Sequence, residues 1–339
     1  MSFASLLLSM KGQKVLVVGD LMLDEYIVGR ATRISPEAPV MVIRQHSTMS
    51  MPGGAANVAK NVIALGGYAT ILGIVGCDPA AETLKTALAE QSIDHTSLVH
   101  DPGRPTTRKT RVLADHAHQV LRIDHEDEEP LSEKAEQELL DQAMALVDQH
   151  EVVVMSDYLK GALTPRIAGA IVTRATSRGI PTVVNPKPRS LGQYRGATLI
   201  GLNRLEASEA LKRWQGIPDE AAEAAAVELR DSMGVQRMVV TLGESGLVAA
   251  GETTHFVPAP RVAVYDTAGA GDTIIATLAL GMAAQADFLE TLKLATHVAA
   301  AVVRRVGVAT PSPEDLARIA AGTDNGRKEA GVAPEATKT

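Results

Sequence analysis

The sequence predicts an α/β fold in which a mostly parallel central sheet is covered by helices on both faces. Short runs rich in Val, Leu and Ile recur along the chain, as expected for parallel strands that are buried on both faces. Segments whose apolar residues recur with the helical period lie between these runs. The chain has 339 residues and is 45% hydrophobic, enough for one large α/β domain or two smaller ones. Regular alternation of strands and helices favours one layered domain.

The first strand is predicted at Lys14–Gly19, an apolar run followed by Asp20, which would stand at the carboxyl edge of the sheet. Apolar residues before Lys11 predict a helical turn or two packed on the body. Four further segments alternate polar and apolar residues and are expected to leave the main sheet: Glu25–Gly29, Pro39–Arg44, Thr106–Leu113 and Gln119–Asp124. The last two are separated by 114–118, which predicts a hairpin.

The remaining elements follow in regular order. Apolar spacing is helical from Gly54 to Leu65, and a strand is predicted at Ala69–Val75. Later elements are a helix from about Leu131, strand Val152–Met155, a helix from Thr164, strands Thr182–Val184 and Thr198–Gly201, helices from about Asn203 and Asp219, strands Met238–Leu242 and Leu247–Ala250, a β segment over Thr253–Val264, and helices from Gly269 and Phe288. The stretch 323–339 is polar and aperiodic, so we expect a disordered tail.

Charge and composition exclude several classes of protein. The net charge is −7 and only 3% of residues are aromatic, so no nucleic-acid partner is expected. Cys77 is the single cysteine and cannot form an internal disulfide, which fits a cytoplasmic protein. The apolar patch at the N-terminus is far shorter than the ~20 residues that span a bilayer, so no membrane partner is expected. His116 and His118 lack a third ligand nearby in the sequence, which favours a solvated loop over a metal site.

The sharpest local signal is the segment Asp266–Asp272, directly before an apolar helix. Its small residues permit a tight turn in which the amides of Gly269, Ala270 and Gly271 point at one anion beside the carboxylate of Asp272. Near a helix N-terminus this carboxylate should remain ionised. The alternative is a glycine-rich turn with an aspartate at the helix N-cap.

A second glycine cluster, Met51–Asn57, also opens a predicted helix. Gly53 and Gly54 would let a ligand approach the backbone closely, and Asn57 could hydrogen-bond a polyhydroxy compound. The same glycines could equally serve to pack the helix against the sheet.

The two clusters together resemble the two signatures of the PfkB (ribokinase-like) carbohydrate kinases, in the correct order, and the resemblance covers residues from about 11 to 315. It implies a ribokinase-like three-layer sandwich, which we place at 11–322. It also implies a small β lid, contributed by about 25–45 and 106–124, that closes over the sugar and often joins two subunits. We therefore expect a homodimer that forms through the lid.

The resemblance also implies roles in phosphoryl transfer from ATP. Asp272 resembles the base that accepts the proton of a sugar hydroxyl, while the amides of residues 269–271 would hold the charge on the transferred group. Asn203 and Glu206 resemble an element in which the glutamate helps to place Mg²⁺ through water. Their alternative reading is a helix capping box.

Further ligand-binding residues follow from the same resemblance. Those expected to line the nucleotide phosphates and ribose are Thr241, Gly243 and Gly246, and those expected around adenine are Ala299, Val303 and Gly307. For the alanine-rich helix that holds Ala299, core packing is a serious competitor. The residues expected to form the sugar face are Asp20, Gly53, Gly54 and Asn57.

Four segments resemble the bacterial heptose 7-phosphate kinases more than other members: 19–26, 33–39, 155–161 and 185–188. This implies phosphorylation of the 1-hydroxyl of D-glycero-β-D-manno-heptose 7-phosphate, on the way to ADP-heptose and the lipopolysaccharide core. A phosphorylated sugar needs cations. Lys160 and Lys187 rank first because they follow predicted strands; Lys109, Arg111 and Arg33 are further candidates. A His-x-Gly-His motif, typical of the adenylyltransferase domain of two-function relatives, is absent, so we expect the kinase alone.

Three alternatives remain open at this point. The chain could be another PfkB kinase, acting on a fructose or tagatose phosphate. It could also be a sugar-binding protein without catalysis on the same fold. A dinucleotide-dependent oxidoreductase is disfavoured, because neither glycine cluster has the G-x-G-x-x-G spacing between a first strand and its helix.

Overall fold

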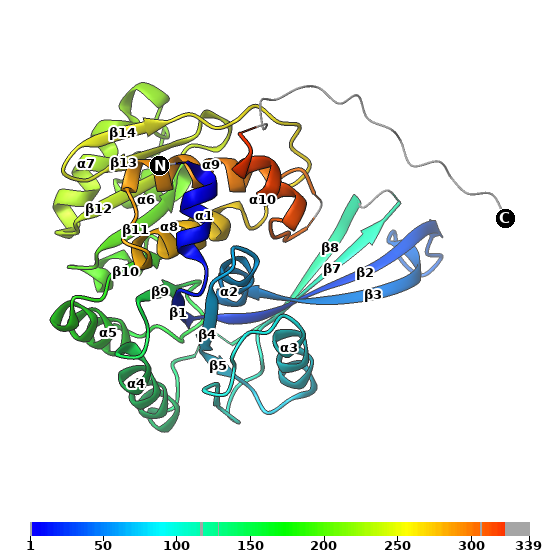
Figure 1. The fold of residues 1–339 in the computed structure, drawn as a ribbon. Coiled ribbons are helices and arrows are strands. Elements are labelled where there is room, and N and C mark those ends of the chain that lie inside the picture. Colours follow the sequence, from blue (N-terminus) through cyan, green and yellow to red (C-terminus); the bar gives the residue numbers. More distant parts are fainter. Residues whose placement is uncertain (1, 116–117, 128, 306, 323–339) are drawn as a thin grey trace.

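The central sheet has eight strands in the order β14-β13-β12-β11-β10-β9-β1-β4 (Figure 1). The computed structural model describes residues 2–115, 118–127, 129–305 and 307–322, so His116 and the expected tail at 323–339 lie outside the described residues. Strand bounds are β1 Lys14–Gly19, β4 Tyr68–Leu72, β9 Val152–Ser156, β10 Thr182–Asn185, β11 Leu199–Asn203, β12 Arg237–Thr241, β13 Leu247–Ala250 and β14 Thr254–Val257. The pairs β12–β13 and β13–β14 are antiparallel and the other pairs in this sheet are parallel, so the predicted mostly parallel sheet is confirmed.

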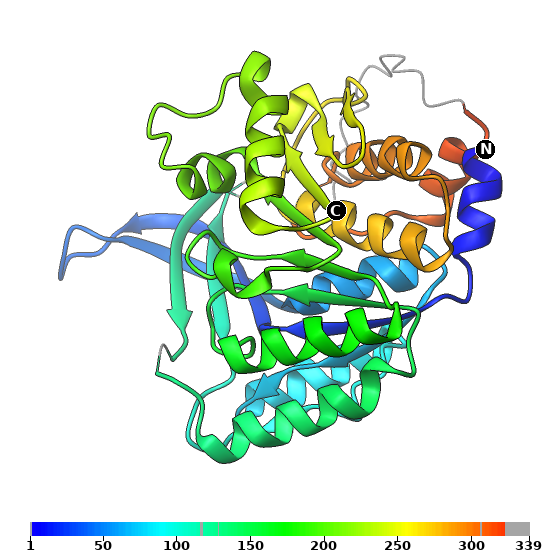
Figure 2. The same ribbon diagram turned by 90° about the vertical axis from the view of Figure 1, so that its left-hand side faces the viewer.

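Helices cover both faces of this sheet, which confirms the three-layer sandwich (Figures 1 and 2). One face packs against α1 Phe3–Met10, α2 Ala55–Ala64, α3 Pro79–Glu90, α8 Ala270–Ala283, α9 Phe288–Val302 and α10 Pro313–Ala320. The other packs against α4 Glu133–Val147, α5 Pro165–Arg178, α6 Arg204–Ala210 and α7 Ala222–Met233. Within β1, Val15 and Val17 join the first core, whereas Leu16 and Val18 join the second. This alternation explains why the strand is apolar throughout.

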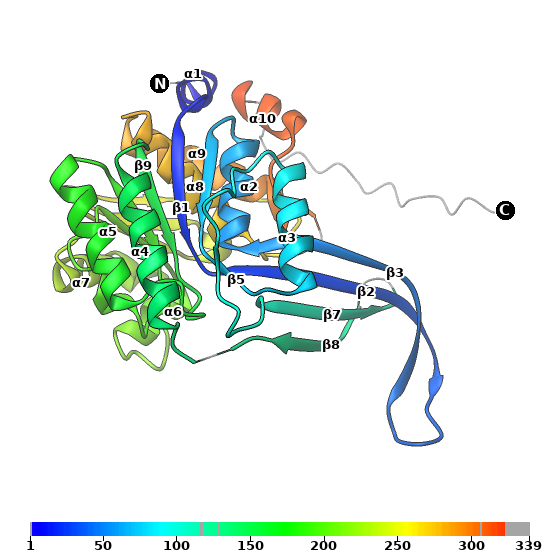
Figure 3. The same cartoon turned by 90° about the horizontal axis from the view of Figure 1, so that it is seen from below.

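A second sheet, which we call the lid, has the order β3-β2-β7-β8 and extends away from the layered body (Figure 3). Its strands are β2 Leu21–Ile34, β3 Met41–Gly54, β7 Arg108–Ala114 and β8 His118–His125. The first two strands are longer than expected, because β2 begins directly after Asp20 and β3 continues through Pro52 to Gly54. Proline is tolerated there because β3 is an edge strand of the lid. The expected antiparallel pairing of the last two segments is present in β7 and β8.

A small two-stranded sheet and the N-terminal helix complete the fold. β5 Ile74–Val75 pairs with β6 Val99–His100 as a small parallel sheet. The N-terminal helix α1 buries Leu6 and Met10 among the helices of the first face, as expected from its apolar residues. Within the described part of the chain, no helix is both long enough and apolar enough to span a membrane.

Candidate active site

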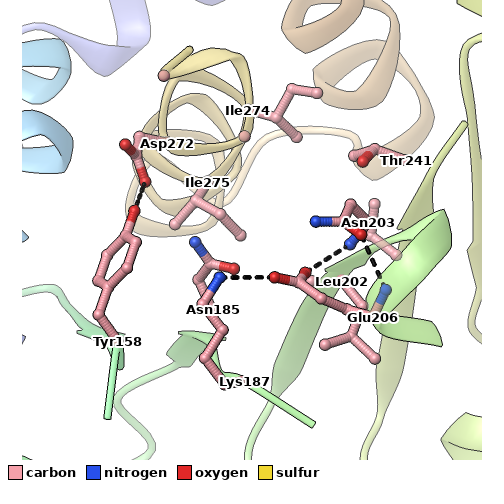
Figure 4. A pocket seen from close by; sticks show the side chains of 14 residues that line it. Tyr158, Asn185, Lys187, Leu202, Asn203, Glu206, Thr241, Asp272, Ile274 and Ile275 are labelled. Carbon is pink, nitrogen blue, oxygen red and sulfur yellow. Dashed lines mark hydrogen bonds and ion pairs between the residues drawn. The ribbon is translucent and has the colours of Figure 1, made fainter. Parts of the chain in front are cut away.

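The carboxylate of Asp272 lies in the first turn of α8 and is 6% exposed. The side-chain amide of Asn57, from α2, donates to its Oδ2 at 2.7 Å. The hydroxyl of Tyr158, which follows β9, donates to its Oδ1 at 3.1 Å (Figure 4). Each oxygen of the carboxylate therefore has a fixed partner from a different layer of the fold, which sets its orientation.

Burial raises the pKa of Asp272 to about 6, while the hydrogen bonds from Asn57 and Tyr158 and the charge of Lys187 act in the opposite direction. The position of Asp272 near a helix N-terminus predicts an ionised carboxylate. The structure adds an opposing effect, because burial of the charged form is costly. A carboxylate with this pKa is mostly ionised at pH 7.5, yet more basic than an exposed aspartate. Both properties suit a general base near neutral pH.

The loop before α8 presents backbone amides to the same region. Gly269 has φ +81°, a left-handed conformation that favours glycine. Within the described residues, no hydrogen-bond acceptor meets the amides of Gly269 and Gly271. Ala270 departs from the prediction, because its amide donates to the carbonyl of Thr267 at 3.3 Å. The anion-binding capacity of this turn therefore rests on the glycine amides more than on Ala270.

Asp266 anchors this loop to the end of α9. Its carboxylate accepts from the amides of Ala268 and Gly307, both at 2.9 Å. The amides of Tyr265 and Asp266 donate to the carbonyl of Val303 at 2.9 and 3.2 Å. Val303 and Gly307 thus hold the loop in place, a role that the sequence did not indicate. That they also surround adenine stays a prediction, as it does for Ala299, which is buried in the core.

A pocket of about 140 Å³ opens at the carboxyl ends of the strands, between α6 and α8. Its lining residues are Tyr158, Asn185, Lys187, Gly201, Leu202, Asn203, Glu206, Val239, Thr241, Gly269, Gly271, Asp272, Ile274 and Ile275. The structure thus brings the predicted base, two glycines of the turn and the predicted nucleotide residues Asn203, Glu206 and Thr241 to one cavity. Gly243 and Gly246 lie in the turn after β12 and do not line it.

Lys187 lines this pocket. Its ammonium contacts Oε1 of Glu206 at 2.7 Å and lies 5.0 Å from the centre of the Tyr158 ring (Figure 4). It therefore lies next to the carboxylate of Glu206, and that it holds the far end of a phosphorylated sugar stays a prediction. A cation at this point can neutralise negative charge between Glu206 and Asp272.

Asn203 and Glu206 form the capping box that was the alternative reading, and they also line the pocket. The Asn203 side chain accepts from the amide of Glu206, and Oε2 of Glu206 accepts from the amide of Asn203, both at 2.9 Å. Among the described residues, no group of three or more metal-ligating side chains could hold a metal by itself. Mg²⁺ that arrives with nucleotide phosphates needs only one or two protein carboxylates, and Glu206 fits that requirement.

The carboxylate of Asp20 is buried and bound by backbone amides. Its Oδ2 accepts from the amides of Tyr158 and Lys160 at 2.7 and 3.0 Å, and its Oδ1 from that of Ala162 at 2.9 Å. It is 2% exposed. Asp20 therefore fixes the loop after β9, and so the position of Tyr158, while its contact with a sugar stays a prediction.

Asp24, which the sequence analysis missed, is a second buried carboxylate close to Asp272. It is buried, binds Arg111 from β7, and packs over Gly53, where a Cβ would lie 2.0 Å from its Oδ2. Gly53 is therefore needed to make room for this carboxylate. Gly54, at φ +60°, ends β3 and starts α2.

Asn57 is the member of the predicted sugar face whose chemistry remains open to a ligand. Its Nδ2 is bound to Asp272, while its buried Oδ1 has no hydrogen-bond partner in the part of the chain that the structure describes. A buried acceptor of this kind is costly unless a donor completes it. A ligand hydroxyl at this position would supply that donor.

The other candidate cations are distributed around the lid. Arg33 is exposed on the distal part of β2. Lys109 and Lys160 both bind Glu126, whereas Arg111 binds Asp24. Lys60 of α2 is buried near Asp24 and Asp272 and was not predicted.

Sequence signals for the missed residues exist in retrospect. Asp24 interrupts an apolar run, which indicates a buried carboxylate, and Tyr158 stands two residues after a strand that ends at the ligand-binding edge of the sheet. Lys60 is a charged residue in a helix that begins at the second glycine cluster and is mostly buried and otherwise without charged side chains.

Comparisons with known proteins agree with this geometry. The model of the pfkB family carbohydrate kinases matches residues 12–315. "Bifunctional protein HldE" of Trichlorobacter lovleyi is 40% identical over 309 residues, which cover 89% of this chain and 62% of that protein. The protein of the same name from Rhodopseudomonas palustris strain BisA53 is 42% identical over 312 residues, covering 90% and 63%. The chain thus spans less than two thirds of the length of these relatives.

Solved structures share the fold. Phosphofructokinase-2 from Escherichia coli in complex with fructose-6-phosphate superposes with a TM-score of 0.75 at 24% identity, covering 92% of this chain and 99% of that one. Ribokinase from Arabidopsis thaliana, complexed with ribose and ATP, gives a TM-score of 0.69 at 18% identity and covers 91% and 99%. With a family match over most of its length and a buried carboxylate beside open amides at the start of α8, the chain belongs to the pfkB family of carbohydrate kinases.

Proposed function

We propose that the protein transfers the γ-phosphoryl group of ATP to the 1-hydroxyl of D-glycero-β-D-manno-heptose 7-phosphate and forms the 1,7-bisphosphate. The observation that carries the kinase chemistry is the carboxylate of Asp272, held by Asn57 and Tyr158 beside the amides of Gly269 and Gly271. Support for the acceptor comes from the segments that resemble heptose 7-phosphate kinases. Three of them supply Asp24, Tyr158 and Lys187 to the region of the site.

The reaction requires one bond to form and one to break at the γ-phosphorus. The acceptor oxygen bonds to phosphorus, its proton passes to Asp272, and the bond to the β,γ-bridging oxygen breaks so that ADP leaves with that electron pair. Asp272 is suited to the proton transfer because burial raises its pKa to about 6. The free amides of the turn would stabilise charge on the transferred oxygens without reorganisation.

The nucleotide side of the proposal uses the pocket described above. Thr241 and Asn203 would lie along the phosphates, and Glu206 would hold Mg²⁺ through water. The metal supplies neutralisation of phosphate charge when it is bound. Lys187 contributes a further positive charge between Glu206 and the transferred group.

The acceptor side of the proposal uses Asn57, Asp24 and the lid. The buried Oδ1 of Asn57 lacks a donor among the described residues, which a sugar hydroxyl would supply, and Asp24 places a second carboxylate near Asp272. A lid closed over the sugar would exclude water, which keeps ATP from being hydrolysed without an acceptor.

We also propose a homodimer that forms through the lid. Register pairs Lys109 with Asp124 and Thr110 with Ile123 across β7 and β8. Because side chains alternate along a strand, Leu121 and Ile123 lie on the face opposite to Lys109 and Asp124. Both are 52% exposed, so this face offers apolar area that a second copy could cover.

The test is ADP release with ATP, Mg²⁺ and one acceptor at a time. The panel contains heptose 7-phosphate, fructose 6-phosphate, ribose and adenosine, with wild type and Asp272→Asn side by side. We expect turnover with the heptose phosphate only, reduced by several orders of magnitude in Asp272→Asn. Turnover of fructose 6-phosphate instead would establish the alternative sugar kinase, and no ADP with any acceptor would favour a binding protein.

A further inference from the structure

Two lysines from separate elements share one carboxylate beside the lid. Lys109 of β7 contacts Oε2 of Glu126 at 3.3 Å, and Lys160, after β9, contacts its Oε1 at 2.7 Å. The three side chains are between 15% and 18% exposed, so the contact is largely withdrawn from solvent. Glu126 therefore occupies the space between two cations with one oxygen directed at each.

The backbones of the two lysines are held by contacts that do not involve Glu126. Lys109 lies on β7, an inner strand of the lid that pairs with both β2 and β8. The amide of Lys160 donates to Asp20, and its carbonyl accepts from the guanidinium of Arg104. Arg104 also donates to the carbonyls of Asp127 and Glu129, so it ties the two loops together. If the Glu126 side chain left, both backbones would stay in place, and the Lys109 ammonium would keep its contact with Asp124.

The cluster adjoins the proposed acceptor region rather than the nucleotide pocket. Lys109 stands opposite Asp24 in the parallel pair of β7 and β2, so both side chains project from the same face of the lid. Lys160 follows two residues after Tyr158, whose hydroxyl contacts Asp272. Neither lysine lines the pocket that contains Glu206.

The local charge favours an anion stronger than a carboxylate. Asp124 contacts Lys109 at 3.3 Å and Arg122 at 2.9 Å, so three cations face two carboxylates in this region. A phosphate group carries up to two negative charges and three acceptor oxygens, whereas Glu126 carries one charge. Exchange of the carboxylate for a phosphate would satisfy both lysines and release Glu126 to water.

We propose that Lys109 and Lys160 bind the phosphate of a phosphorylated acceptor, and that Glu126 holds this site until the acceptor displaces it. This inference rests on the proposed function, since it takes the acceptor to carry a phosphate distant from the reacting hydroxyl. It adds a basis for selectivity: an unphosphorylated sugar has no group that can replace Glu126 between the two cations. Glu126 thus disfavours acceptors that lack the phosphate.

The test compares Glu126→Gln, Lys109→Met and Lys160→Met with wild type in the full chain. The probe is inorganic phosphate, titrated by calorimetry, and the second readout is KM for heptose 7-phosphate. We expect Glu126→Gln to bind phosphate several-fold more tightly, because the competing charge is gone. Each lysine variant should bind it at least about tenfold more weakly. The amides before α8 are unaltered in all variants, so the differences report the cluster alone.

A remote ion pair on α3 supplies matched controls, Glu82→Gln and Lys85→Met, which should leave phosphate binding unchanged. The sign of the Glu126→Gln effect is decisive: weaker binding, parallel to the lysine variants, would mean a structural ion pair and overturn the inference. Equal phosphate binding in all variants would overturn it too. If wild type does not phosphorylate the heptose, the proposed function fails, while the calorimetric order of the variants still decides whether the cluster binds phosphate.

Discussion

The hydroxyl of Tyr158 donates to Oδ1 of Asp272 across 3.1 Å and joins the base to the loop after β9. Burial and the neighbouring carboxylate of Asp272 raise the pKa of Tyr158 well above its usual value, so the hydroxyl keeps its proton and remains a donor. Lys187 stacks on the same ring and pairs with Glu206. The proposed base and the proposed metal-side carboxylate are therefore connected through two intervening side chains.

This connection predicts the pH dependence of turnover. Asp272 must be ionised to accept a proton, so kcat/KM should fall as the pH drops through about 6. The Tyr158 hydroxyl favours the ionised carboxylate, so Tyr158→Phe should raise the pKa of Asp272 and move this acid limb to higher pH. At pH 7.5 we expect kcat/KM to fall by about tenfold. The measurement is a kcat/KM profile between pH 5 and 9 for both proteins.

Tyr194→Phe is a matched control for that experiment. Tyr194 is also buried and donates to a carboxylate, Asp157, at 2.7 Å, but it does not line the pocket. Its removal should lower stability and leave the acid limb where it is in wild type. An equal displacement of the limb in both variants would show that the Tyr158 effect is not specific to the base.

The raised pKa of Asp272 also predicts a stability cost at the site. The folded-state value of about 6 lies above the ordinary 3.8, so folding favours the protonated form. The stability that protonated Asp272 contributes to the fold is fully present below pH 3.8 and is lost as the pH rises through about 6. Two pKa units correspond to about 3 kcal/mol, so Asp272→Asn should be more stable than wild type by up to that amount at pH 8.

Urea unfolding at several pH values checks this expectation. The excess stability of Asp272→Asn should shrink as the pH is lowered from 8 and vanish well below pH 3.8, where wild-type Asp272 is protonated in both states. The side chain of asparagine can still form hydrogen bonds with Asn57 and Tyr158, so lost hydrogen bonds should not mask the gain in stability. A variant that is less stable than wild type at pH 8 would contradict the assigned cost of burying the charge.

The proposed dimer is tested on the face of the lid that carries Leu121 and Ile123. Ile123→Glu places a charge among exposed apolar residues that a second copy would cover, and it should convert the dimer to a monomer in sedimentation experiments. Phe256 is 48% exposed on β14 of the main sheet, remote from the lid, so Phe256→Glu should leave the assembly unchanged. Wild type that sediments as a monomer at micromolar concentration would disprove the dimer.

Much of the fold could be predicted from the sequence because each central strand is a local signal. β1, β9 and β12 are short apolar runs, and burial on both faces of the sheet requires such runs. The lid was found only in part, since Pro52 and two glycines read as a loop although an edge strand accommodates them. Helix α10 was missed, although Ser312 and Asp315 form a capping box at its start.

The site was harder to predict, because its decisive contacts join distant parts of the chain. Asp272 was found from its local glycine-rich turn, but its partner Tyr158 is 114 residues away and no local pattern links the two. Asp20 was assigned to the sugar face because it directly follows the first strand, and Asp24 was not considered. The amides of the loop after β9 satisfy Asp20, whereas Asp24 is held by Arg111 near Asp272, and only the folded chain reveals that difference.

Gly53 gives the sharpest test of how the acceptor side is built. A Cβ at this position would lie 2.0 Å from Oδ2 of Asp24, which is buried and held by Arg111. Gly53→Ala must therefore displace that carboxylate, and we expect KM for the sugar to rise at least about tenfold while KM for ATP changes little. Gly169 in α5 has nothing within 4 Å of a Cβ, so Gly169→Ala should raise stability by about 0.5–1 kcal/mol and leave both KM values unchanged. An equal rise in both KM values in Gly53→Ala would show that the whole site, and not Asp24 alone, had moved.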